Sequence, residues 1–199
     1  YEALMGDDEP QTFVLPTRVE NLFIIPADRS LTGAEIELVS MLAREQRLKR
    51  IVDALRPEFD DIFIDCPPSL GLLTLNALVA ADAVLIPLHC EYFALEGLAD
   101  LVGTMRRVRT ALNPSLDIEG VLLTMYDDRT NLGQLVARDV REFFKDKVFD
   151  TIIPRNVRLG EAPSHGVPAV LYDVKSRGAA AYVALAKEML ARRAAWTIR

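Results

Sequence analysis

Cysteine is scarce in this sequence, with only Cys66 and Cys90 among 199 residues. Two cysteines are too few for a disulfide framework, and no charged and apolar leader opens the chain, so a reducing cytoplasm is the expected compartment. Long apolar runs are also missing, because the longest, residues 70–81, is interrupted by Thr74 and Asn76. It falls short of the roughly 20 residues that a bilayer span needs, and we expect no transmembrane helix.

Glycine is scattered rather than clustered. None of the ten glycines is followed by a lysine, so the GxxxxGK[ST] loop that cradles phosphates with its backbone amides is absent from these residues. The chain opens at Tyr1 with a segment that is typical of a helix tail running into an acidic loop. We therefore expect this sequence to be part of something longer.

Positive charge is in deficit, with a formal net charge of -6, but the deficit is uneven. Residues 1–128 hold 10 basic and 22 acidic side chains, whereas residues 129–199 hold 13 and 7. The basic last third is compatible with a nucleic-acid or phosphate surface. Composition alone favours the alternative, a chance bias spread over solvated helix faces.

Apolar patterning alternates between short strands and longer helices. The run 61–65 is apolar without alternation, as in a strand buried on both faces of a parallel sheet. A helix after Ser30 or Thr32 would bury Ile36, Val39 and Leu42. The remaining expected strands are 22–26, 83–88, 118–124 and 148–153, and the expected helices include 70–81, 95–112, 132–143 and a last one around 182–189. This alternation predicts an α/β fold, a mostly parallel sheet with helices on both faces, in one domain spanning 1–199.

Polar residues follow the expected strands where a parallel sheet would place a ligand site. The segments 65–69, 89–92, 125–129 and 154–156 should share one rim. Asp65 ends its strand where a phosphate-binding ATPase places a carboxylate that holds Mg²⁺ through a water. A helix-capping Asp is about equally common there, but the stiff Pro67-Pro68 turn and Gly71 favour a loop that senses phosphate.

Several long strings carry a family resemblance: IFIDCPPSLGLLTLNAL, CEYFALEGL, GVLLTMYDDRTNL, IPRNVRLGEAPSHG and SRGAAAYVALAKEML. They resemble the ParA/Soj family of chromosome- and plasmid-partitioning ATPases, deviant Walker A members of the P-loop NTPase class. The resemblance extends from about Val19 almost to the C-terminus. It implies ATP and Mg²⁺ as cofactors, an ATP-bound homodimer, non-specific DNA binding and stimulation of hydrolysis by a ParB-type partner at the nucleoid.

The resemblance also assigns roles to individual residues. Asp65 matches the Walker B aspartate, 66–71 matches the switch II loop, and Pro154 and Asn156 match the loop that closes on adenine. A proline ring can pack on a base and an asparagine can hydrogen-bond its edge, although both residues also favour plain turns.

Arg129 and Arg158 match the positions that hold DNA in the family, and both should lie in strand-end loops where a guanidinium can reach phosphate. Lone exposed arginines are more often solvated, but two on one rim in the basic segment shift that balance. Weaker candidates for the same surface are Lys145, Lys147, Arg155, Lys175 and Arg177.

Three residues match the segment near the dimer and partner surface in relatives: Glu91, Tyr92 and Glu96. His89 and His165 have no metal-ligand companions at useful spacing, and we interpret both as structural. The two cysteines lack CxxC spacing, which argues against the iron–sulfur carriers of the superfamily.

The sequence departs from the family at the nucleotide site, because the KGGxGK[ST] loop, its lysine and the switch I aspartate are absent. By resemblance they would lie upstream of Tyr1 on the first strands of the sheet, so we expect a fold lacking those strands, without catalytic residues of its own. Two alternatives stay open. One is a MinD-like division-site ATPase, although the tail ARRAAWTIR has only a weak apolar face for a membrane anchor. The other is a non-catalytic DNA-binding or scaffold module that has lost its P-loop.

Overall fold

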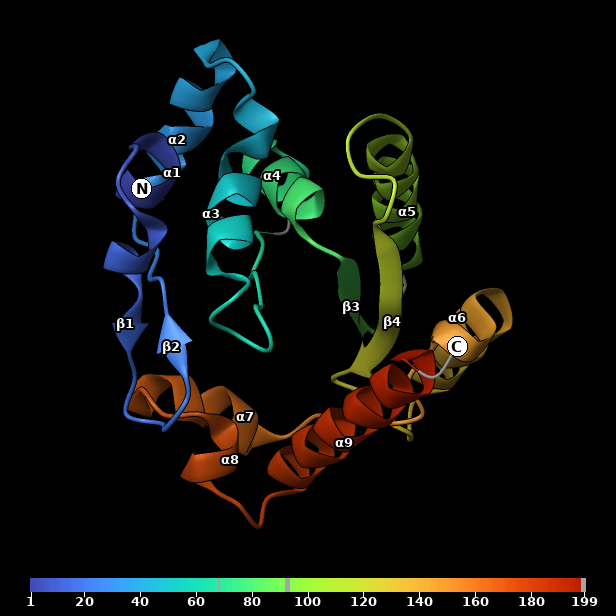
Figure 1. The fold of residues 1–199 in the computed structure, drawn as a ribbon. Helices are drawn as coiled ribbons and strands as arrows, with labels where there is room; N and C mark the ends of the chain where they lie inside the picture. The colour runs from blue at the N-terminus through green and yellow to red at the C-terminus, as the bar shows by residue number, and fades with distance from the viewer. Residues whose placement is uncertain (68, 92–93, 198–199) are drawn as a thin grey trace. The chain divides into compact units, whose positions relative to one another are not determined.

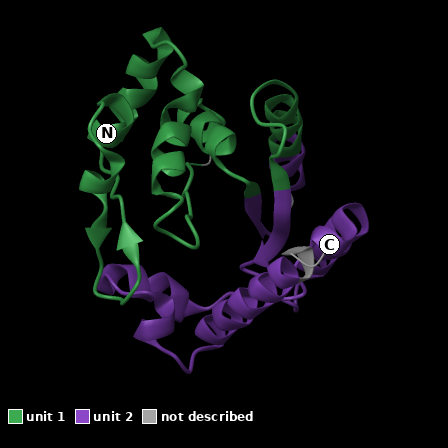
Figure 2. Ribbon diagram, in the orientation of Figure 1, with its two compact units in different colours: residues 1–83, 101–117 green, residues 84–100, 118–199 purple. Residues whose placement is uncertain are grey.

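The computed structural model describes residues 1–67, 69–91 and 94–197, with the backbone alone at 195–197. The chain divides into two compact units (Figure 2), residues 1–83 with 101–117 and residues 84–100 with 118–199. Each unit therefore combines two stretches that are separate in sequence. Whether the whole chain acts as one domain stays a prediction.

The helices and strands follow the chain in the order shown in Figure 1. The first unit contains α1 (Glu2–Met5), β1 (Leu15–Pro16), β2 (Phe23–Ile24), α2 (Leu31–Glu37), α3 (Arg47–Leu55) and α4 (Leu72–Ala80). The unit boundary crosses β3 (Ala83–His89), α5 (Ala94–Ala111) and β4 (Asp117–Thr124). The second unit continues with α6 (Asn131–Phe144), α7 (Val157–Glu161), α8 (Ala169–Tyr172) and α9 (Arg177–Thr197). Short 3₁₀ turns cover Pro10–Phe13, Leu38–Ser40, Arg44–Gln46, Lys145–Lys147 and Ala162–His165.

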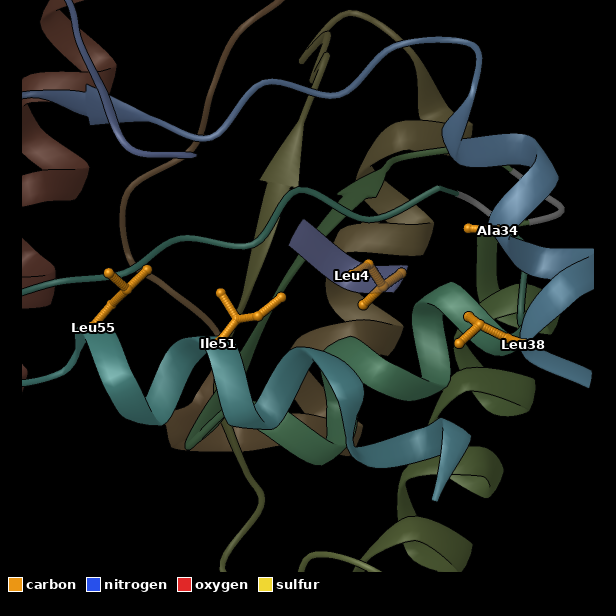
Figure 3. Packing of buried hydrophobic residues seen from close by; sticks show 5 residues of the cluster. All are labelled: Leu4, Ala34, Leu38, Ile51 and Leu55. Atoms are coloured by element: carbon orange, nitrogen blue, oxygen red, sulfur yellow. The ribbon is translucent and has the colours of Figure 1, made fainter. Parts of the chain in front are cut away.

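The core of the first unit forms where α1, α2 and α3 meet. Its buried members, shown in Figure 3, are Leu4, Ala34, Leu38, Ile51 and Leu55. Arg47 fixes the end of α1 by donating to the carbonyl groups of Leu4, Met5 and Gly6 at 2.8–2.9 Å. These bonds satisfy carbonyls that a helix end leaves without partners, so the short helix stays docked on α3.

The apolar stripe expected at Ile36, Val39 and Leu42 is wrong as a core prediction. These side chains are 76%, 59% and 95% exposed, whereas Ala34 and Leu38 are buried. The helix ends at Glu37 and the chain passes through 3₁₀ turns to Ala43, which has a left-handed backbone (φ 51°). Because the helix does not continue, residues three apart no longer share one face.

The sheet of β3 and β4 confirms the α/β class predicted from the sequence. The amide of Asp117 donates to the carbonyl of Asp82 (3.1 Å), so both strands start at the same end, and Figure 1 shows them running parallel with α5 as the connection. Residues 120–124 of β4 are buried without alternation. That pattern is typical of a strand covered on both faces.

The strand expected at 61–65 is not formed. The segment has no regular secondary structure, and Phe63 is 72% exposed. Within the described part of the chain no strand pairs with it, and a strand without a neighbour has nothing to hydrogen-bond its backbone. Earlier in the chain, the expected strand 22–26 is reduced to β2, which pairs antiparallel with β1.

The segment 148–153 lies beside β4 in the predicted parallel direction but does not form a regular strand. The amides of Phe149 and Ile153 donate to the carbonyls of Val121 and Leu123 at 3.0 and 2.9 Å. The two donors are four residues apart and the two acceptors only two apart, so the segment bulges between them. The amides of Asp150 and Thr151 donate to the carboxylate of Glu188 on α9, both at 2.9 Å. This carboxylate replaces the sheet partner in the bulged stretch.

The same part of α9 covers the core of the second unit. The ring of Phe149 is fully buried and lies over Gly120, where a side chain would overlap it. The guanidinium of Arg192 lies 4.3 Å from the ring centroid and donates to the Val148 carbonyl (2.8 Å) and to Glu188 (2.7 Å). Apolar packing, a cation–π contact and backbone hydrogen bonds thus hold 148–153 against α9.

We predict that Glu188→Gln lowers the free energy of unfolding at neutral pH by about 1–2 kcal/mol, because the charged acceptor of two backbone amides and of the Arg192 guanidinium becomes neutral. Burial alone would raise the pKa of Glu188, but hydrogen bonds from Thr151 and Asp150 and the charge of Arg192 bring it below its usual value of 4.5. The wild-type advantage is therefore present above about pH 4.5 and lost as the pH falls through the lower folded-state pKa. Urea unfolding across this pH range measures it.

The matched control is Glu142→Gln, which removes the same charge from an exposed position on α6. It should change the stability by less than about 0.5 kcal/mol. Equal effects of the two substitutions would contradict the role given to Glu188.

Candidate functional site

Two loops that are far apart in sequence meet at one edge of the second unit. One follows β4, and the other joins the segment 148–153 to α7. The amide of Tyr126 donates to the carbonyl of Ile153 (3.2 Å), and the amide of Arg155 donates to the carbonyl of Tyr126 (3.1 Å). Tyr126 and Pro154 thereby form a parallel bridge. The expectation that 125–129 and 154–156 share a rim is confirmed, and we call the two segments 126–130 and 154–158 the paired loops.

The first of the paired loops holds Arg129 in a tight turn. The Asp127 carboxylate accepts the backbone amide of Arg129 (3.1 Å) and also its guanidinium, through Nε at 2.8 Å and Nη2 at 2.6 Å. Thr130 caps α6 by accepting the Gly133 amide (3.2 Å) and donates to the Asp127 carbonyl (3.0 Å). The loop is fixed by its own side chains, as expected for an Asx turn before a capped helix.

The second of the paired loops places Asn156 and Arg158 at the start of α7. The Asn156 side-chain oxygen accepts the amide of Arg158 (2.9 Å), which caps the helix and leaves the Asn156 amide group directed elsewhere. The guanidinium of Arg158 pairs with Glu161 (2.8 Å) and Asp173 (3.4 Å). Asn156 thus serves as a helix cap with its NH₂ donors still available to a ligand.

Asp65 belongs to the first unit, and its side chain is exposed in the irregular segment before α4. Its residue type suits a magnesium ion held through water. Desolvation, and then the negative charge of Asp65, raise the pKa of the neighbouring Cys66 thiol. The switch II match covers 66–71, of which Pro68 lies outside the described residues; Thr74 of α4 ties this loop by donating to the Ser69 carbonyl (2.6 Å).

The weaker basic candidates differ in how free they are. Lys147 donates to the Ile118 carbonyl (2.8 Å) and is therefore committed to the start of β4. Arg155 lies in the second of the paired loops and its backbone amide forms the bridge to Tyr126. Lys145, Lys175 and Arg177 are exposed. Among these five, Arg155 is the one that the paired loops themselves contain.

The residues proposed for a partner surface are only partly described. Glu91 and Glu96 are exposed at the end of β3 and the start of α5, and Tyr92 lies outside the described residues.

The His165 ring stacks on Tyr172 at 4.8 Å between centroids. No group of three potential metal-ligating side chains occurs within residues 1–67, 69–91 and 94–197, and none of the helices described there is long and apolar enough to cross a membrane.

The carboxylates that pair with the two arginines were not found by sequence reasoning. Hydrogen bonds from the Arg129 side chain and then from its backbone hold the pKa of Asp127 well below its usual range. A hydrogen bond from Arg158 likewise lowers the pKa of Glu161. The signal for both was present, because Asp-X-Arg is typical of an Asx turn and Arg158 and Glu161 stand three apart on a helix.

Comparison with known proteins gives consistent relatives. The family model described as an AAA domain matches residues 1–118. The chain is 58% identical over 191 residues to the sporulation initiation inhibitor protein Soj of Bacillus subtilis, covering 96% of this chain and 76% of that protein. It is 55% identical to the chromosome partitioning protein ParA of Myxococcus xanthus, covering 96% and 68%.

A solved structure extends the likeness to the fold. The cobyrinic acid a,c-diamide synthase of Mycobacterium smegmatis, crystallised with a bound ATP analogue and magnesium, superposes with a TM-score of 0.72 at 39% identity. The match covers 86% of this chain and 66% of that one.

We predict that Gly133→Ala opens the first of the paired loops. A Cβ at Gly133 would lie 2.8 Å from the Thr130 hydroxyl oxygen and 3.2 Å from the Asp127 carbonyl oxygen, so the cap has to shift. Loss of a cap of this kind lowers the free energy of unfolding by about 1 kcal/mol. Chemical denaturation measures the change.

Gly103→Ala provides the matched control with the opposite sign. Gly103 lies inside α5, where an added Cβ meets nothing within 4 Å. Alanine should stabilise the protein there by about 0.5–1 kcal/mol, because glycine weakens a helix interior. If both substitutions stabilise the protein, the tight packing of the loop at Gly133 is contradicted.

Proposed function

This chain belongs to the ParA/Soj family of chromosome-partitioning proteins, and we propose that it is part of an ATPase that segregates DNA. In the proposed cycle ATP bridges two subunits, the homodimer binds DNA without sequence preference, and a ParB-type partner stimulates hydrolysis. The protein would act in the cytoplasm, at the nucleoid.

The observation that carries the proposal is the meeting of the paired loops. Tyr126 and Pro154 bring Arg129 to the edge that also holds Asn156 and Arg158. Exposed guanidinium groups at loop ends and helix starts are suited to phosphate contacts, which position a protein on DNA without reading its sequence. The geometry therefore supports a surface with adenine-facing and DNA-facing groups side by side.

Each unit by itself contains residue types that suit ATP·Mg²⁺. In the first unit, Asp65 offers an exposed carboxylate for the magnesium shell. In the second unit, Asn156 retains amide donors that can meet the edge of a base next to the ring of Pro154. When bound, ATP·Mg²⁺ supplies the phosphoryl group and the charge that its transfer requires. The backbone cradle and the lysine for the phosphates are absent from the 199 residues, so we assign no catalytic residue within this chain.

In these 199 residues joined to the part of Soj that the chain does not cover, with ATP and magnesium present, we predict that Arg129→Ala and Arg158→Ala each weaken binding to duplex DNA about twofold to tenfold, by the same factor for unrelated sequences. Fluorescence anisotropy with two labelled duplexes of different sequence and equal length measures both the loss and its sequence independence.

Arg138→Ala is the control, because Arg138 is equally exposed but lies inside α6 rather than in the paired loops. Its affinity should equal that of the wild type. Loss of affinity for only one of the two duplexes, or an equal loss in Arg138→Ala, would contradict the assignment.

We also predict that the 199-residue chain by itself neither binds ATP tightly nor hydrolyses it. A P-loop supplies most phosphate contacts through backbone amides and one lysine, and Asp65 and Asn156 do not replace them. Calorimetric titration with ATP and magnesium tests this, with magnesium alone as the reference. A micromolar dissociation constant would overturn the prediction.

A further inference from the structure

Both arginines proposed for DNA contact are paired with carboxylates of their own neighbourhood. Arg129 meets Asp127 through two parallel hydrogen bonds of 2.8 and 2.6 Å. Arg158 meets Glu161 at 2.8 Å and Asp173 at 3.4 Å. Each guanidinium therefore presents a phosphate with much less than a full positive charge.

The two partners of the first pair differ in freedom. The Asp127 side chain is 22% exposed and its carboxylate also accepts the backbone amide of Arg129, so its position is fixed by the turn. The Arg129 side chain is 84% exposed. The carboxylate is therefore a negative charge fixed by the backbone turn, and the guanidinium bound to it is exposed to solvent.

The pairing leaves room for a ligand on the outer side of Arg129. A guanidinium has five N–H donors, and Asp127 takes two of them from the Nε–Nη2 edge. The other donors can reach a phosphate, but that phosphate then lies close to the carboxylate behind. Repulsion between the two anions offsets part of the attraction, and a phosphate that meets an ion pair instead of a free cation releases fewer of the counterions condensed on the DNA.

We propose that Asp127 and Glu161 are counter-charges that set the strength and the salt dependence of phosphate binding by Arg129 and Arg158. The inference rests on the proposed DNA contact of these arginines, and it makes the two carboxylates positioning residues rather than DNA ligands. The ligand class is the phosphodiester backbone of duplex DNA. Each carboxylate weakens phosphate binding while it stays hydrogen-bonded to its arginine.

Acid does not open the first pair under ordinary conditions. Hydrogen bonds from Arg129 keep the pKa of Asp127 far below its usual value, so the carboxylate stays charged near neutral pH. Substitution is therefore the direct way to remove its charge.

The test is Asp127→Asn in these 199 residues joined to the part of Soj that the chain does not cover, with ATP and magnesium present. Affinity for a labelled duplex is measured by anisotropy from about 50 to about 200 mM salt. Asparagine keeps a side-chain oxygen for the Arg129 amide and removes the negative charge. We expect binding about threefold to tenfold tighter at the low salt concentration. The slope of log affinity against log salt should become steeper by up to about 0.9, the value for one more neutralised phosphate.

Asp128→Asn is the matched control. It removes the same charge one residue away, from an exposed side chain whose charge acts on Arg129 more weakly than that of Asp127. Its effect should stay below about twofold, and the slope should not change. Equal effects of Asp127→Asn and Asp128→Asn would overturn the proposal, because general electrostatics would then explain both.

An Arg129→Ala background separates this inference from the DNA contact itself. In the Arg129→Ala background, Asp127→Asn should raise the DNA affinity no more than Asp128→Asn does, because the cation that pairs with Asp127 is gone. If Arg129→Ala weakens binding but Asp127→Asn does not tighten it, the counter-charge proposal alone is wrong. If Arg129→Ala leaves affinity unchanged, or if no form of the chain binds the duplex, the DNA contact is wrong and the counter-charge role falls with it.

Glu161→Gln gives an independent measurement should Asp127→Asn fail to fold. It keeps an acceptor for Arg158 and for the Tyr172 hydroxyl, which lies 3.3 Å from the Glu161 carboxylate. We expect tighter binding and a steeper slope, both smaller than for Asp127→Asn because Asp173 still pairs with Arg158 at 3.4 Å. An unchanged affinity would contradict the proposal at this second position.

Discussion

The proposed DNA-binding surface depends on how the backbone of 148–154 is held beside β4. Three hydrogen bonds join it directly to β4 and the following loop, at Val121, Leu123 and Tyr126. Where the segment bulges away, the Glu188 carboxylate takes the two free amides, and Arg192 ties Glu188 to the Val148 carbonyl. Because Pro154 and Asn156 continue directly from this segment, α9 indirectly sets their position relative to Arg129. A helix at the end of the chain thus supports a site to which it contributes no ligand.

The electrostatics of this surface follow from local pairs rather than from net charge. The formal charge of -6 argues against DNA binding when taken alone, and the basic last third argues for it. Neither charge count describes what a phosphate meets at this surface, because Arg129 and Arg158 each face a carboxylate within 3 Å. Exposed pairs of this kind contribute little to folding stability. Their consequence lies in how much positive charge the paired loops offer to a phosphate.

The sequence predicted the elements that are set by long local patterns. The helices α4, α5, α6 and α9 and the strands β3 and β4 lie where periodicity placed them, because each buries a face that its own residues define. The segment 61–65 was predicted as a strand and is not one, because a strand also needs a neighbour that local sequence does not supply. The stripe at Ile36, Val39 and Leu42 failed because α2 ends at Glu37, so the helical spacing on which the stripe depends does not continue to Val39 and Leu42.

The candidate site was predictable to a similar extent. Motif strings assigned Arg129, Asn156 and Arg158, and strand-end reasoning placed their loops on one rim. Asp127 and Glu161 were missed because only basic residues were sought in this part of the sequence, not the carboxylates that pair with them. Glu188 was missed because its pairing with Arg192 is an ordinary one within a helix, and its two other partners are backbone amides, which carry no side-chain signature. In both cases the missing information is the contact between residues, not the residue types.

We propose that two separate segments, 126–130 and 154–158, form one DNA-binding edge. Backbone amide signals in NMR spectra test this while duplex DNA is added to these 199 residues joined to the part of Soj that the chain does not cover, with ATP and magnesium present. We expect signals from both segments to shift together and give the same dissociation constant, while exposed residues of α6 such as Arg138 and Glu142 stay unchanged. Shifts confined to other segments, or different constants for the two loops, would contradict it.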